Sequence, residues 1–462
     1  MIQQREVPLI KEHLNRQPKS LLIRGGRIID PSQQVDAIGD LFIADGKVRW
    51  LSTQGTFSAP ENCPVVYARG MVVCPGFIDI HCHLREPGFE EKETIATGTR
   101  AAAKGGFTTV CCMPNTDPPV DSGATVEYIL SVAANEGVVR VLPVGCVTKA
   151  RAGSELADFS ELSTSGVIAF SDDGNPIADS LLMRRALEYS RDSGLPVIDH
   201  CEDTSLSKAG VMNEGTVANR LGLKGIPAAA EESMVARDIE LARVTGGRLH
   251  IAHVSTAGSV ALIRRAKEGG IPLTAEVTPH HLTMTEERVT SPSGYDTNAK
   301  VNPPLRTARD VQALIAGLKE GVIDAIATDH APHTDADKRC EFENAAFGIS
   351  GFETALGSLM ELVHRGELDL VTLVSKLTHE PASFLRRDDL GTLKADATAD
   401  VTIFDPDAEW AVDPLAFASK GKNTPLAGCV LKGKVMATIC GRKVVYKDDA
   451  IKLETARREA GA

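Results

Sequence analysis

The stretch Pro75-Gly76-Phe77-Ile78-Asp79-Ile80-His81-Cys82-His83-Leu84-Arg85 organises the rest of the chain. Its apolar run, residues 77–80, predicts a short buried strand. Alternate side chains of a strand point to the same face, so His81 and His83 are expected to project together. Two imidazoles on one face can chelate a divalent metal, although two polar residues at the end of a strand would give the same pattern. The residues at the other strand ends therefore decide between the two interpretations.

The composition is typical of a globular protein with a sizeable core. The 462 residues carry a formal net charge of −12, and 43% of them are hydrophobic. No block rich in Lys and Arg is present, so nucleic acids and anionic membranes are poor partners. The ten cysteines form no Cys-x-x-Cys pair, which indicates reduced thiols and a cytoplasmic protein. Residues 1–20 contain no apolar leader and the chain has no run of about 18 apolar residues, so we expect neither secretion nor a membrane span.

Apolar strand-like segments alternate with amphipathic helical segments from residue 75 onward and give eight β/α units. Such alternation predicts parallel strands joined by helices, and eight units favour an α/β fold of the (β/α)8 TIM-barrel type. An open doubly wound sheet is the alternative, but no Gly-x-Gly-x-x-Gly motif follows the first strand. Short β segments occupy both chain ends, and Asp45-Gly46 between two of them predicts a hairpin.

The change from short β segments to alternating strands and helices, and back again, predicts a division of the chain into domains. Residues 1–20 are expected to be a polar N-terminal extension, helical around residues 9–14. Residues 21–74 and 386–455 are expected to form one small β-sandwich domain from the two chain ends. Residues 75–385 are expected to form the metal-dependent barrel between them.

The ends of the predicted barrel strands carry histidine and aspartate, and reactive residues of such barrels lie at these ends. Imidazole and carboxylate ligands without cysteine suit Zn²⁺ or a similar ion. Four histidines and two aspartates exceed one tetrahedral shell, so a binuclear site is favoured over a mononuclear one. Two metal ions would lower the pKa of a bound water and polarise a carbonyl, which is suited to the hydrolysis of an amide-like bond. The residues are His81, His83, Asp173, His200, His253 and Asp329.

Other polar residues are expected at the same end of the predicted barrel. Arg85, Asn115 and His333 could together hold a carboxylate through charge-assisted hydrogen bonds. Each of them alone could equally form a surface ion pair or cap a loop. Asn302 lies in the long segment after the seventh strand. The Gly-rich apolar segment 345–351 could line or cover a substrate, or cap the next helix.

Several longer motifs run in order through the predicted barrel, and one more lies in the C-terminal tail. They are HCHLREPG at 81–88, MPNT at 113–116, FSDDG at 170–174, DHCED at 199–203, AHVST at 252–256, AEVTPHHL at 275–282, VNPPLR at 301–306, ATDHAPH at 327–333, FGISGFETA at 347–355 and SKGKNTP at 419–425. Over roughly residues 20–450 the chain resembles the amidohydrolase superfamily and, within it, dihydroorotases of the bacterial class I type.

The resemblance implies two zinc ions per chain. It implies that His81, His83 and Asp329 bind the first zinc, and that His200 and His253 bind the second. Asp173 would bridge them, with Asp172 as the alternative. Other superfamily members use a carboxylated lysine as the bridge, and no lysine stands at this strand end.

The implied reaction is the reversible cyclisation of N-carbamoyl-L-aspartate to dihydroorotate in de novo pyrimidine biosynthesis. Asp329 would act as general base and then general acid. Arg85, Asn115 and His333 would hold the substrate carboxylate, and His83 would contact substrate as well as metal. The ring amide would be held by Asn302 and by the backbone of Phe347 and Gly348.

Two alternatives accompany this interpretation. Allantoinases and hydantoinases, the latter including dihydropyrimidinases, share the paired histidines and the final aspartate but normally use the bridging lysine. A non-catalytic dihydroorotase-like scaffold for aspartate transcarbamoylase would typically lack metal histidines, whereas all six ligand positions are filled here. A homo-oligomer and an association of the active enzyme with that transcarbamoylase are both compatible with the sequence.

Overall fold

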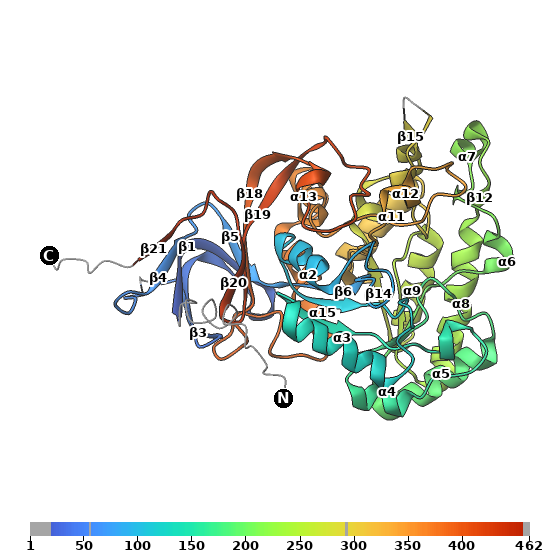
Figure 1. The fold of residues 1–462 in the computed structure, drawn as a ribbon, viewed down its shortest axis with the longest axis horizontal. Helices are drawn as coiled ribbons and strands as arrows, with labels where there is room; N and C mark the ends of the chain where they lie inside the picture. Colours follow the sequence, from blue (N-terminus) through green and yellow to red (C-terminus); the bar gives the residue numbers. More distant parts are fainter. Residues whose placement is uncertain (1–19, 55–56, 292–293, 456–462) are drawn as a thin grey trace, which may run out of the picture.

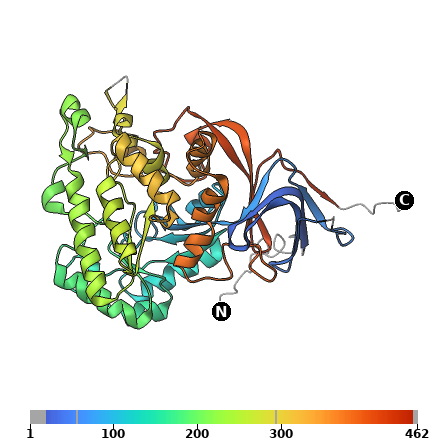
Figure 2. The ribbon, with the colours of Figure 1, turned by 180° about the vertical axis from the view of Figure 1, so that it is seen from behind.

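The computed structural model describes residues 20–54, 57–291 and 294–455. The chain combines a large, mostly antiparallel sheet at one side with helices and short parallel strands at the other, as Figure 1 shows. Figure 2 gives the same division from behind. The helix expected around residues 9–14 lies outside the described residues.

Two sets of parallel strands form the centre of the helical part. Cys82 and His330 form a parallel bridge between the sets, and Gly145 and Phe170 form another at the opposite edges. Each bridge involves one residue, His330 or Gly145, that lies just beyond the end of a strand. One set is β6 (Phe77–Cys82), β7 (Phe107–Cys112) and β8 (Arg140–Pro143). The other is β9 (Phe170–Ser171), β10 (Val197–Asp199), β13 (Leu249–Ile251), β14 (Leu273–Val277) and β17 (Ala325–Ile326).

Helices connect these strands and begin at side-chain caps. The hydroxyl of Thr94 accepts from the backbone of Thr97, and Thr307 and Asp310 form a reciprocal capping box. Such caps satisfy backbone N–H groups that the first helical turn leaves unpaired. The main helices are α2 (Ile95–Lys104), α3 (Gly123–Glu136), α4 (Phe159–Ser165), α5 (Ser180–Ser193), α8 (Ala228–Thr245), α9 (Ala257–Glu268), α11 (Ala308–Lys319), α13 (Ala355–His364), α14 (Leu370–Leu377) and α15 (His379–Phe384). Among the described helices, none is long and apolar enough to cross a membrane.

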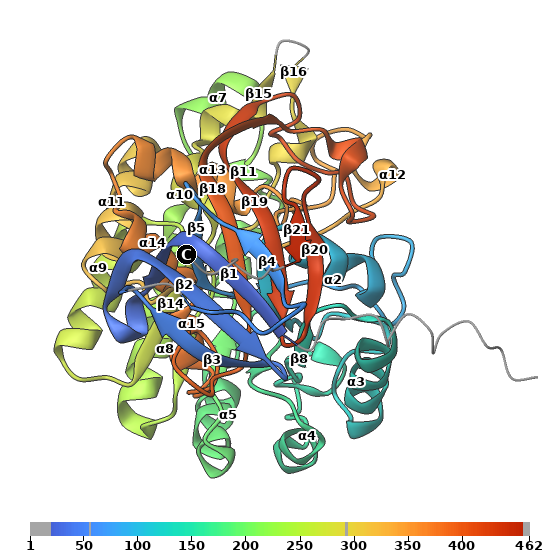
Figure 3. The ribbon, with the colours of Figure 1, turned by 90° about the vertical axis from the view of Figure 1, so that its left-hand side faces the viewer.

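Strands from both chain ends pair in one sheet of nine strands, several of which lie side by side in Figure 3. Antiparallel pairing of β5 (Val72–Pro75) with β18 (Val401–Ala411) joins the two contributions, with Val73 opposite Ile403. Asp45 and Gly46 have φ angles of 54° and 75° and form the predicted hairpin. The N-terminal strands are β1 (Ser20–Asp30), β2 (Val35–Ala44), β3 (Lys47–Ser52), β4 (Pro64–Tyr67) and β5 (Val72–Pro75). The C-terminal strands are β18 (Val401–Ala411), β19 (Val430–Cys440), β20 (Lys443–Lys447) and β21 (Leu453–Thr455).

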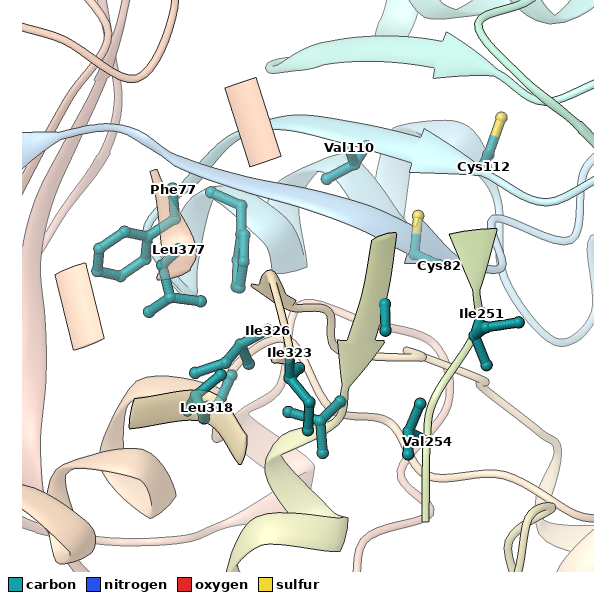
Figure 4. Packing of buried hydrophobic residues seen from close by; sticks show 14 of the residues in the cluster. Phe77, Cys82, Val110, Cys112, Ile251, Val254, Leu318, Ile323, Ile326 and Leu377 are labelled. Carbon is teal, nitrogen blue, oxygen red and sulfur yellow. The ribbon is translucent and has the colours of Figure 1, made fainter. Parts of the chain in front are cut away.

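The largest apolar cluster packs the parallel strands against the helices, and Figure 4 shows part of it around β6 and β7. The rings of Phe77 and Phe107 meet with centroids 5.7 Å apart. Buried Asp79 accepts hydrogen bonds from the backbone N–H (2.9 Å) and the hydroxyl (2.6 Å) of Thr328, so β6 is tied to the end of β17. This packing fixes the strand ends from which the candidate site is built.

Candidate metal centre

The first group of candidate ligands lies where β6, β9 and β17 end. His83 Nε2 is 3.0 Å from Asp329 Oδ1, and His81 Nε2 is 3.6 Å from the same oxygen. Asp173 approaches both histidines: its Oδ1 lies 3.4 Å from His81 Nε2 and its Oδ2 lies 3.6 Å from His83 Nε2. Four side chains from three strand ends therefore converge.

A second group adjoins the first across the same aspartate. His200 follows β10 and His253 follows β13. Their facing nitrogens, His200 Nδ1 and His253 Nε2, are 2.9 Å apart. Asp173 Oδ1 lies 3.7 Å from His200 Nδ1 and 3.6 Å from His253 Nε2. Asp173 thus lies within contact of all four histidines.

The neighbouring Asp172 is bound elsewhere. Its Oδ1 accepts from the backbone N–H groups of Val147 (2.9 Å) and Thr148 (3.1 Å). Its Oδ2 accepts from the hydroxyl of Thr148. The structure therefore brings Asp173, and not Asp172, into the histidine cluster.

The donor atoms suit a divalent metal. A tetrahedral ion with bonds of about 2.0–2.1 Å separates its ligand atoms by roughly 3.3 Å, and the distances in the cluster bracket that value. His81 Nε2 and Asp173 Oδ1 are buried and have no hydrogen-bond partner among the residues that the structure describes. Buried polar atoms of this kind are normally satisfied, and a bound cation would satisfy both. The residues present could hold a metal.

The electrostatics of the cluster agree with this fit. Burial by itself would raise the pKa of Asp173, but His81, His200 and His253 hold that pKa well below its usual range. Burial would lower the pKa of His200, but Asp173 and Glu202 raise it to about 10. The carboxylates thus favour positive charge on His81 and His200, and a metal would bind by displacing those protons.

A cavity of about 220 Å³ opens beside the cluster. It is lined by every predicted ligand except His81 and by every predicted substrate contact. Arg85 lies at one wall with its Nη2 3.4 Å from His333 Nε2. The Nε2–H of His333 donates to the carbonyl of Phe347 (2.8 Å), and Asn302 donates from Nδ2 to Glu202 (2.8 Å).

Comparison with known proteins assigns the chain to a family. Residues 70–259 match the family model described as Dihydro-orotase-like. A protein of Citrifermentans bemidjiense named dihydroorotase is 53% identical over 428 residues, which cover 93% of this chain and 100% of that protein. A dihydroorotase of Pelotomaculum thermopropionicum is 53% identical over 433 residues, covering 94% and 100%. The chain belongs to the dihydroorotase family.

Solved structures share the fold at lower sequence identity. The L-hydantoinase (dihydropyrimidinase) from Arthrobacter aurescens superposes with a TM-score of 0.82 at 23% identity, covering 94% of this chain and 98% of that one. A dihydropyrimidinase from Brevibacillus agri gives a TM-score of 0.79 at 21% identity, covering 94% and 96%. These likenesses concern the mixed α/β fold with its sheet domain.

Two glutamates that contact the cluster were not singled out from the sequence. Glu276 Oε1 lies 2.5 Å from His81 Nδ1, and Glu202 Oε2 lies 3.1 Å from His200 Nε2. A carboxylate inside the apolar strand β14 was the available signal for Glu276. Asn115 Oδ1 contacts His83 Nδ1 at 2.8 Å. Asn115 therefore orients a candidate ligand as well as lining the cavity.

Backbone strain is concentrated at this site. Arg85, His253 and Asp329 have φ angles of 64°, 32° and 45°, in the left-handed region that non-glycine residues rarely adopt. Each such residue costs about 1–3 kcal/mol. Gly348 has a φ of 140°, and a Cβ there would lie 2.6 Å from the Cβ of Ala331. The surrounding packing thus holds these residues in conformations that direct them to the cavity.

Proposed function

We propose that the chain catalyses the reversible hydrolysis of (S)-dihydroorotate to N-carbamoyl-L-aspartate in de novo pyrimidine biosynthesis. The observation that carries the proposal is the position of Asp329 and Arg85 on one cavity, beside the histidine cluster. Asp329 provides a proton acceptor, and Arg85 provides a cation for an acidic substrate. The dihydroorotase relatives support the same reaction.

We infer that the eight parallel strands form a closed (β/α)8 barrel over residues 75–385. The bridges from Gly145 to Phe170 and from Cys82 to His330 support closure. Residues 21–74 and 386–455 would form the β-sandwich, and residues 1–20 an extension. The protein would act in the cytoplasm as a homo-oligomer. Sedimentation of the chain alone measures whether it forms a homo-oligomer. Sedimentation of a mixture with aspartate transcarbamoylase measures whether the two proteins associate.

The proposal includes two zinc ions. His81, His83 and Asp329 would hold one, His200 and His253 the other, and Asp173 would contact both. When bound, the pair would polarise the ring carbonyl and the attacking water. The donor set and the unsatisfied atoms of His81 and Asp173 support this assignment.

Asp329 is the proposed catalytic residue. Burial alone would raise its pKa, but the hydrogen bond with His83 and the neighbouring imidazoles hold that pKa below its usual range. An ionised Asp329 can therefore accept a proton from water as the new C–O bond forms. It then returns the proton to the ring nitrogen as the C–N bond breaks, and cyclisation follows the same steps in reverse.

The cavity wall would bind the acidic substrate. Arg85 faces the cavity, and the Nδ2 of Asn115 can donate because its Oδ1 already contacts His83. These groups and His333 would hold the carboxylate. Asn302 and the backbone of Phe347 and Gly348 would hold the ring amide. A local cation thus allows an acidic protein to bind an acidic substrate.

A turnover assay compares dihydroorotate with allantoin and dihydrouracil, with and without a chelator. We expect chelator-sensitive turnover of dihydroorotate only, and an Asp329→Asn variant without measurable turnover. Preference for allantoin or dihydrouracil would replace the proposed substrate. Full activity of Asp329→Asn would remove the proposed catalytic residue.

A further inference from the structure

Lys338 is a buried lysine whose ammonium donates to backbone carbonyls and to no side chain among the described residues. It ends α12 (Asp335–Lys338) and is 4% exposed. Its Nζ donates to the carbonyls of Thr297 (3.1 Å), Lys300 (3.4 Å) and Ala346 (2.7 Å). An ammonium has three donors, so the backbone carbonyls use all of them.

Lys300 makes a matching set of contacts from the other side. Its Nζ donates to the carbonyls of Phe342 (2.7 Å) and Glu343 (2.9 Å). The same ammonium lies 4.5 Å from the centroid of the Phe347 ring. A cation over an aromatic face at this distance is attracted to the ring.

The two lysines therefore join two loops that border the cavity. Backbone contacts reinforce the junction, since Gly348 N–H donates to the Lys300 carbonyl (2.9 Å) and the Thr297 hydroxyl donates to the Lys338 carbonyl (2.7 Å). Lys300 stands two residues before Asn302. Ala346 directly precedes Phe347 and Gly348. Each loop thus carries part of the wall assigned to the ring amide.

Burying two lysines at this junction costs folding free energy, which a contact that only joined two loops would not require. Burial, together with the charge of Lys300, lowers the pKa of Lys338 to about 7. Two like charges share the junction, although apolar packing could join loops without that cost. The ammonium groups instead satisfy five carbonyls of irregular backbone, which fixes the path of both loops. Neither lysine lines the cavity.

We propose that Lys300 and Lys338 are positioning residues that hold the Phe347–Gly348 backbone in register with Asn302 for substrate binding. The inference rests on the proposed dihydroorotase function and deepens it. The lysines do not touch substrate. Their loss should weaken substrate binding while leaving the cluster around Asp173 in place.

The test compares Lys338→Met and Lys300→Met with Lys376→Met. Lys376 on α14 is a matched control, because it is 6% exposed and its Nζ donates to the Ile323 carbonyl (2.8 Å), away from the cavity. Steady-state kinetics on dihydroorotate, zinc content and urea unfolding are measured for each. We expect KM to rise about tenfold or more in the two site variants with kcat within about threefold and zinc content unchanged. Lys376→Met should lose stability with unchanged KM.

An unchanged KM in Lys338→Met and Lys300→Met would overturn the inference, as would an equal rise in Lys376→Met. Lys338→Gln removes the charge but keeps two hydrogen-bond donors. If a methionine variant does not fold, KM for dihydroorotate is measured in Lys338→Gln instead. A several-fold rise of its KM supports the proposal, and a wild-type KM overturns it. Absence of dihydroorotate turnover in the wild type would instead contradict the proposed function, so the two failures are distinguishable.

Discussion

The carboxylate of Glu276 contacts the imidazole of His81 on the side away from the candidate metal centre, with Oε1 2.5 Å from Nδ1. Both side chains are fully buried. The other oxygen of Glu276 lies 3.1 Å from His250 Nε2, so the carboxylate is held from two sides. A proton on Nδ1 of His81 leaves Nε2 free to face Asp173 and Asp329. Carboxylates in this position orient metal-binding histidines and increase their basicity.

Glu276→Gln should weaken zinc binding, because the amide keeps the shape of the side chain but removes its charge. We expect zinc affinity and kcat to fall about 10- to 100-fold. Competition with a fluorescent chelator measures the affinity. Glu286→Gln is a control, since Glu286 is a buried glutamate that binds Asn213 (2.7 Å) outside the cluster. Wild-type zinc affinity in Glu276→Gln would contradict the role given to this contact.

Asp173→Ala should disrupt both halves of the cluster, because Asp173 lies 3.4–3.7 Å from histidines of each half. Elemental analysis of zinc-reconstituted wild type is expected to give about two zinc ions per chain, and the variant fewer than two. Turnover should fall below detection. One zinc ion per wild-type chain would argue against the proposed bridge.

The candidate ligands could be predicted because each stands within a few residues of the end of an apolar run. A strand ending in His81 or Asp329 is a local pattern, and the alternation of strands and helices predicts that such ends meet. Glu276 shows the limit of this reasoning. Its strand could be predicted. When both faces of a strand are buried, however, the sequence pattern does not show to which face a given side chain points.

Short segments inserted between the parallel strands and their helices were not predictable in the same way. The sequence indicated one helix after β10, whereas the structure inserts α6 (Thr204–Ser207), β11 (Met212–Asn213), α7 (Thr216–Leu221) and β12 (Gly225–Ile226) before α8. These elements are too short to give a periodic pattern. The SKGKNTP motif could be recognised in the sequence. It lies in the connection between β18 and β19, and its contacts with residues of the cavity wall are long-range contacts that the sequence pattern does not predict.

Arg85→Ala should raise KM for dihydroorotate about 10- to 100-fold, because it removes the cation proposed to hold the carboxylate. Arg85→Lys should give an intermediate KM, since lysine keeps the charge but not the planar fork. Stopped-time assays over a wide substrate range separate KM from kcat. Arg184→Ala, which removes an exposed helix ion pair, is the control. Unchanged KM in Arg85→Ala would disprove the carboxylate contact.

Lys338 should make stability depend on pH. Burial and Lys300 lower its pKa to about 7 from 10.5, against the opposing carboxylates of Asp296 and Asp337. Between these values the unfolded chain binds one more proton, so this group's contribution rises with pH and is lost as pH falls through about 7. Urea unfolding at several pH values from about 6 to 9 should show the wild type gaining stability relative to Lys338→Met. Parallel pH profiles of the two proteins would contradict the shift.

Asn423 ties the C-terminal segment to the cavity wall with all of its hydrogen-bonding groups. Its Oδ1 accepts from His333 N–H (2.9 Å) and the Ser350 hydroxyl (2.8 Å), and its Nδ2 donates to the carbonyls of Ala331 and Gly348, both at 3.0 Å. In Asn423→Asp, a carboxylate oxygen would face those two carbonyls in a buried position.

Loss of two donors and burial of a charge should destabilise Asn423→Asp by about 2–5 kcal/mol. Because Asn423 holds both His333 and Gly348, KM for dihydroorotate should rise more than kcat falls. Asn135→Asp, at an exposed helical asparagine, is the matched control and should change neither quantity. Equal KM values for Asn423→Asp and the wild type, measured on folded protein, would show that the wall keeps its geometry without this side chain. In that case the loop contacts of Lys300 and Lys338 would be sufficient to position Gly348.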